Sequence, residues 1–126
     1  MDSAIWSLAL RRKTATGRHV GAWADLVRRG QAMIIGPVRQ EVLSGIREQA
    51  QFDRVRDRLR PFADLPLAAQ HFERAAEFYN TCRTRGVQGS PTDFLICAVA
   101  DMEGLRIFTA DGDFQHYARH LPIDLL

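Results

Sequence analysis

The sequence has 126 residues, of which 46% are hydrophobic and 25% are charged, and these values are typical of one compact soluble domain. We therefore expect a single domain over residues 1–126, with a core that needs no disulfide or metal to hold it. No apolar run reaches the ~18 residues of a membrane span, and the two cysteines stand in predicted helices, which favours a reduced, cytoplasmic protein. The formal net charge of +2 is too small to indicate a broad nucleic-acid-binding field.

Helical patterns and short apolar strands alternate along the chain. In chain order they are a helix over 20–29, a strand over 32–35, a helix from Gly36-Pro37, a helix over 47–60, a weak strand near Leu65, helices over 68–85 and 92–103, and strands over 105–109 and 123–126. The helix over 92–103 has almost no polar face, so we expect it to be buried. Continuous apolar strands separated by helices predict a parallel sheet covered on both faces, and hence an α/β fold with a small doubly wound sheet.

Four carboxylates fall at junctions of these elements, and a doubly wound sheet places its site beyond the carboxyl ends of its strands. Asp2 stands at the start of the chain, and Glu41 lies one turn into the helix that follows the strand over 32–35. Asp93 opens the buried helix, and Asp111 directly follows the next strand. Each has a structural explanation on its own, as a helix cap, a first-turn acid or a turn residue, and Ser90 with Asp93 would make a capping box.

Taken together, the four acids favour a metal site. Carboxylates crowded at one edge of a sheet repel and raise one another's pKa unless a hard cation neutralises them, and no lysine accompanies them as a fixed counter-charge. Oxygen ligands suit Mg²⁺ or Mn²⁺, and an ion held in this way can activate a water for attack on phosphorus. The constellation therefore predicts phosphodiester hydrolysis.

The same residues carry a resemblance to a known family. The matching pieces are Asp2-Ser3 with Trp6, the run from Pro37 to Gly45, Ser90-Pro91-Thr92-Asp93, and Thr109 through Phe114 with the closing Leu125-Leu126. In this order they resemble PIN-domain ribonucleases, and among these the VapC toxins of type II toxin-antitoxin systems. The resemblance implies a three-layer α/β/α fold with a short central parallel sheet.

The resemblance also implies roles and partners. It implies that Asp2, Glu41, Asp93 and Asp111 are catalytic metal ligands, with Asp113 as an accessory acid. Ser3, Thr92 and Thr109 would be their hydroxyl neighbours. It further implies bound Mg²⁺ or Mn²⁺, an RNA substrate, a homodimer, and a VapB-type antitoxin that inhibits the enzyme in a heterotetramer or larger complex. Among the seventeen basic residues only Lys13 is lysine, and four arginines are candidates for RNA phosphate contacts: Arg11, Arg12, Arg39 and Arg85.

One departure from the family pattern concerns the first strand. The family places its first acid at the end of a central parallel strand, whereas here only Met1 precedes Asp2. A strand usually needs ~5 residues, and loss of a middle strand would expose the edges of its neighbours. We therefore expect the first strand to be truncated at the start of this sequence.

Two alternatives belong to other functional classes. A signalling receiver domain is also small and doubly wound, but it needs a lysine late in the sheet, and Lys13 is early. A catalytically silent PIN-like module that only binds a partner is compatible with the sequence. Retention of all four acids favours the enzyme, because a binding-only site has no electrostatic reason to tolerate them.

Overall fold

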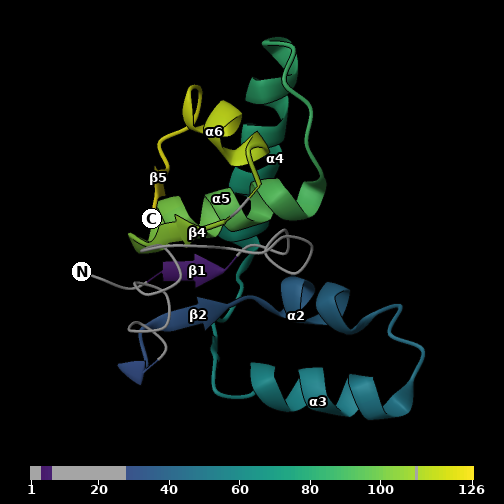
Figure 1. Ribbon diagram of the computed structural model, residues 1–126. Helices are drawn as coiled ribbons and strands as arrows, with labels where there is room; N and C mark the ends of the chain where they lie inside the picture. The colour runs from purple at the N-terminus through teal and green to yellow at the C-terminus, as the bar shows by residue number, and fades with distance from the viewer. Residues whose placement is uncertain (1–3, 7–27, 110) are drawn as a thin grey trace.

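A computed structural model describes residues 4–6, 28–109 and 111–126, and its described part contains one parallel sheet (Figure 1). The strand order is β3-β2-β1-β4-β5, which is a doubly wound arrangement. The strands are β1 (Ala4–Trp6), β2 (Ala32–Ile34), β3 (Ala63–Asp64), β4 (Arg106–Phe108) and β5 (Asp124–Leu125). The predicted α/β class with a short central parallel sheet is confirmed, and β2 to β5 all fall within one or two residues of their predicted positions.

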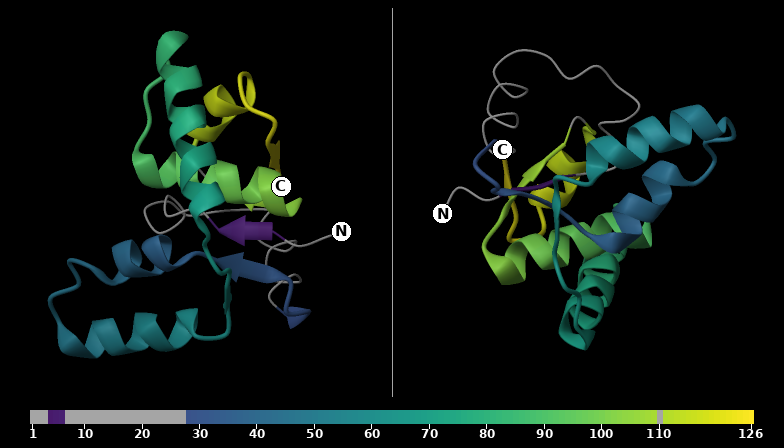
Figure 2. Two further views of the ribbon diagram at one scale, coloured as in Figure 1. Left: turned by 180° about the vertical axis from the view of Figure 1, so that it is seen from behind. Right: turned by 90° about the horizontal axis from the view of Figure 1, so that it is seen from below.

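The helices also follow the predicted order. They are α2 (Gly36–Leu43), α3 (Gln49–Leu59), α4 (Ala69–Thr84), α5 (Pro91–Glu103) and α6 (Asp113–Ala118). Helix α5 lies along β4 and α4 packs against α5, on the same side of the sheet (Figures 1 and 2). Helices α2 and α3 form a separate pair that extends from the β2 side of the molecule. Most of the helix predicted over 20–29 lies outside the described residues.

Helix α5 forms the centre of the core, as its apolar sequence predicts. Every residue from Phe94 to Ala100 is buried, including Cys97, which is a free thiol. The helix begins with Ser90, whose hydroxyl accepts a hydrogen bond from the backbone N–H of Asp93, and ends at Gly104 in the left-handed conformation. Its burial fixes the position of its first turn, where Asp93 lies.

The centre of the sheet is occupied by β1. Ala4–Trp6 pairs in parallel with β2 on one side and with β4 on the other, with Ala4 opposite both Ala32 and Arg106. The central strand is therefore present but only three residues long, and it follows Asp2 in the sequence, whereas the family pattern places a strand before the first acid. The physical reason is that β2 and β4 would otherwise present unpaired edges, and this apolar segment satisfies their hydrogen bonds.

Arg39 connects α2 to the edge strand β3. Its guanidinium donates hydrogen bonds from Nε and Nη2 to Asp64 at 3.0 and 2.8 Å. It also donates to the backbone carbonyls of Leu59 and Phe62 at 3.1 and 3.2 Å. All three nitrogens are thus bound to protein oxygens, so Arg39 has a structural role that ties α2 to β3 and to the segment before it.

Candidate active site

Three of the predicted acids lie on the segments that follow β2 and β4. Glu41 is on α2, which begins two residues after β2, and Asp111 and Asp113 follow β4. Asp93 lies in the first turn of α5, the helix that packs on β4. Asp2 lies outside the described residues. The topology therefore places the other four acids at the carboxyl-end side of the sheet, where such folds carry their sites.

Glu41 is connected to the start of α5 by a direct hydrogen bond. The hydroxyl of Thr92 donates to Glu41 Oε1 at 2.8 Å. Thr92 is the residue before Asp93, so this bond joins the two predicted metal-ligand segments, which are about fifty residues apart in sequence. The contact holds Glu41 next to the segment that carries Asp93.

Asp93 is partly buried and surrounded by hydrogen-bond donors and other acids. The phenolic hydroxyl of Tyr117 donates to Asp93 Oδ2 at 2.8 Å. Burial raises the pKa of the Asp93 carboxyl, the hydrogen bonds of Tyr117 and Ser90 partly offset this, and the charges of Asp111 and Asp113 raise it further. The charges of Asp111 and Asp113 thus act on Asp93, in addition to the larger effect of burial.

The loop after β4 is held by local hydrogen bonds. The backbone N–H of Asp111 donates to the hydroxyl of Thr109 at 3.0 Å, and the backbone N–H of Asp113 donates to Asp111 Oδ1 at 2.9 Å. The second bond is an Asx turn that starts α6. Asp111 therefore has the turn role that its sequence suggests, and the same bond orients its carboxylate.

The donor chemistry of these residues fits a hard cation. Within residues 4–6, 28–109 and 111–126 no three acidic, histidine or cysteine side chains converge into a complete ligand cluster. This arrangement is compatible with Mg²⁺, which keeps several waters and is often held by one or two carboxylates plus substrate phosphates. Burial and, to a smaller extent, the charges of Asp111 and Asp113 disfavour the ionised form of Asp93, and a bound cation would offset both effects.

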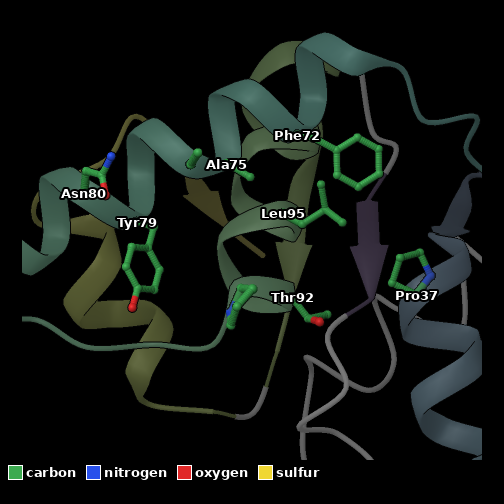
Figure 3. Close-up of a pocket in the computed structure, with 9 residues that line it drawn as sticks. Pro37, Phe72, Ala75, Tyr79, Asn80, Thr92 and Leu95 are labelled. Atoms are coloured by element: carbon green, nitrogen blue, oxygen red, sulfur yellow. The ribbon is translucent and has the colours of Figure 1, made fainter.

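An apolar groove of about 540 Å³ opens beside these residues, between α2, α4 and α5 (Figure 3). In Figure 3, Phe72 lies next to Leu95, Pro37 lies farther out on the same side, and Thr92 lies below Leu95. Thr92 lines the groove and also donates to Glu41, so the groove borders the contact between α2 and α5. Its lining residues are Pro37, Phe72, Ala75, Ala76, Tyr79, Asn80, Pro91, Thr92 and Leu95.

Sequence reasoning missed Tyr117. It lies one helical turn after Asp113 and looks like an ordinary aromatic of the short C-terminal helix, so its spacing carries no signal for a contact with Asp93. Burial and the Asp93 carboxylate both raise the pKa of Tyr117, so its hydroxyl remains protonated and acts as the donor.

The raised pKa of Asp93 predicts how its contribution to stability depends on pH. The folded-state pKa lies above the unfolded value, so the folded protein binds this proton more readily, and ionisation at neutral pH weakens folding. Without metal, Asp93→Asn should therefore unfold at a higher urea concentration than the wild type at pH 7. The difference should shrink as pH falls through the folded-state pKa, toward about pH 4. Urea titrations in EDTA across this range measure it, and a difference independent of pH would contradict the assignment.

The fold and its acids define a doubly wound α/β protein with an acidic site beyond its strands. The family model described as the PIN domain matches residues 1–120, and the chain belongs to the PIN domain family. Proteins of this family are generally nucleases that use divalent metal ions. No curated protein in the comparison matches the chain. None of the helices among the described residues is long and apolar enough to cross a membrane.

Two solved structures are similar in fold. The crystal structure of FitAcB from Neisseria gonorrhoeae superposes with a TM-score of 0.71 at 15% identity, over 98% of this chain and 96% of that one. A toxin-antitoxin complex from Klebsiella pneumoniae superposes with a TM-score of 0.63 at 23% identity, over 89% and 90% of the two chains. At these identities the comparison shows a shared fold that extends over nearly the whole chain.

Proposed function

We propose that this protein is the toxin of a type II toxin-antitoxin system, a Mg²⁺- or Mn²⁺-dependent endoribonuclease built as a single PIN domain over residues 1–126. The observation that carries the proposal is the partly buried carboxylate of Asp93 in the first turn of α5, whose pKa is raised by burial and, to a smaller extent, by the charges of Asp111 and Asp113. A protein gains nothing in stability from crowding like charges in this way. A hard cation bound by these acids would neutralise their charges. Hydrolysis of RNA phosphodiester bonds is the chemistry that the family and the type of ligand favour.

In this proposal the acids have different roles in binding the metal. Asp2, Glu41, Asp93 and Asp111 are the catalytic ligands, and Asp113 is an accessory acid. Thr92 holds the Glu41 carboxylate, and the Asx turn at Asp111 fixes the carboxylate that follows β4. When bound, Mg²⁺ or Mn²⁺ lowers the pKa of a water and stabilises the leaving oxygen of the phosphodiester.

The proposal includes protein partners. One solved structure with this fold is described as a toxin-antitoxin complex, which supports an inhibitory antitoxin of the VapB type. Phe72 on α4 is 52% exposed and lines the apolar groove, and this exposed apolar surface supports a homodimer or a larger complex with antitoxin that covers it. Light scattering of the purified protein, alone and with its antitoxin, measures both assemblies.

Metal-dependent cleavage of RNA tests the function. The purified protein should cleave RNA with Mg²⁺ or Mn²⁺ present, lose that activity in EDTA, and regain it when metal is restored. A Glu41→Gln/Asp93→Asn double variant, purified in the same way, controls for contaminating nuclease. Metal-dependent cleavage by the wild type alone supports the enzyme. Equal cleavage by both proteins, or none by either, would favour the silent binding module.

A further inference from the structure

The contact between Tyr117 and Asp93 joins the core to the acidic site. Tyr117 is fully buried, and its ring packs against Phe94 at 4.9 Å and against Phe114 at 5.1 Å between centroids. A tyrosine buried among aromatic rings must find a partner for its hydroxyl. Here that partner is the Oδ2 atom of Asp93, at 2.8 Å.

Gly89 provides the space for this contact. A Cβ atom at position 89 would clash with the Tyr117 hydroxyl oxygen, and it would lie 2.7 Å from Tyr117 Cζ and 3.0 Å from Phe94 Cε2. Position 89 does not need glycine for a left-handed backbone, because its φ is not positive. The glycine is therefore required by the side chain of Tyr117, which approaches the backbone directly before α5.

We propose that Tyr117 is a positioning residue that orients the Asp93 carboxylate toward a bound metal ion, and that Gly89 keeps the path of its hydroxyl open. This inference rests on the proposed function of the acidic site. The Asp93 backbone is already fixed by its N–H bond to Ser90 at 3.1 Å, so rotation of the carboxylate is the freedom that remains. A hydrogen bond to Oδ2 restricts this rotation and leaves acceptor positions for a metal, since a carboxylate has about four lone-pair sites.

The test is Tyr117→Phe, which keeps the buried ring and removes only the hydroxyl. Partners of metal ligands typically contribute about 10- to 100-fold to metal affinity or activity. We therefore expect Mn²⁺ to bind at least about tenfold more weakly in calorimetry, and kcat for RNA cleavage to fall by a similar factor. The KM for RNA should change little, because the hydroxyl is buried behind Asp93 and is not placed to touch RNA.

Tyr79→Phe is the matched control. Its ring packs edge-on against the other side of Phe94 at 5.6 Å, and its hydroxyl accepts from Arg83 at 3.3 Å, away from Asp93. This variant should bind Mn²⁺ as the wild type does. If a hydroxyl has only a structural role, its removal lowers thermal stability and leaves the Mn²⁺ affinity unchanged. Equal Mn²⁺ affinity and kcat for the two variants would therefore overturn the proposal.

Gly89→Ala gives an independent route to the same result. The added methyl should displace the Tyr117 hydroxyl and weaken Mn²⁺ binding to the extent seen in Tyr117→Phe. Wild-type Mn²⁺ affinity in Gly89→Ala would contradict the proposal, because the added methyl cannot fit beside the Tyr117 hydroxyl oxygen as the structure places it. If the wild type binds Mn²⁺ but cleaves no RNA, the proposed function is wrong and the Mn²⁺ measurements still decide the role of Tyr117. If the wild type binds no Mn²⁺, both are wrong.

Discussion

Replacing Asp93 by asparagine should reduce the rate of RNA cleavage by at least about a hundredfold. Loss of a residue that only supports a metal ligand reduces activity by up to about a hundredfold, and loss of a ligand should cost at least as much. The substitution removes the charge of a proposed ligand and preserves its shape. The backbone N–H bond to Ser90 is unaffected, and the amide oxygen can still accept from Tyr117. The fold should therefore remain while the metal is bound more weakly.

Single-turnover cleavage of one RNA, with circular dichroism of each protein, measures this effect. Asp101→Asn is the matched control, because it makes the same chemical change near the other end of α5, where Asp101 pairs with Arg74 at 3.4 Å. Asp101→Asn should cleave RNA at the wild-type rate. Cleavage by Asp93→Asn at the rate of Asp101→Asn would show that Asp93 is not a metal ligand in the reaction.

Phe94→Ala should lower the free energy of unfolding by about 3–5 kcal/mol, the range for truncating a buried aromatic side chain. Phe94 is 1% exposed and its ring contacts the rings of both Tyr79 and Tyr117. Truncation would leave a cavity directly behind Asp93, and the neighbouring rings are held by their own helices and cannot fully collapse into it.

Urea unfolding at neutral pH measures this loss, and Met102→Ala on the same helix is the control. Met102 is 41% exposed, so its truncation removes far less packing and should cost well under the loss at Phe94. Similar losses for the two variants would show that α5 is not the centre of the core. Because Phe94 also supports Tyr117, its truncation should reduce Mn²⁺ affinity as well.

The parts of the fold that local sequence patterns encode were predictable. Helix α5 is apolar on nearly all sides and begins with Ser90-Pro91, so both its burial and its first residue follow from its sequence. The strand at Ala4–Trp6 did not follow, because three residues carry no periodicity and their pairing depends on the edges that β2 and β4 present. Tertiary context decides such short strands.

The acidic residues of the site could be predicted from the sequence, but the residues that position them could not. Glu41, Asp93 and Asp111 stand at recognisable junctions of strand and helix, so topology alone brings them to one side of the sheet. The contact of Tyr117 with Asp93 joins residues 24 positions apart through the packing of two helices, and only the assembled core specifies it. The roles of these acids, including Asp2, stay predictions until the variants are measured.

The binding of Arg39 also bears on how the protein would respond to salt. Binding of RNA releases counterions from its phosphates in proportion to the number of cations that replace them, and this number sets the slope of affinity against ionic strength. Arg39 is already paired with Asp64 and held by two carbonyls, so we expect it to add little to that slope. A count of arginines therefore overstates the number of charges available to RNA, even in a chain whose cations are almost all arginine.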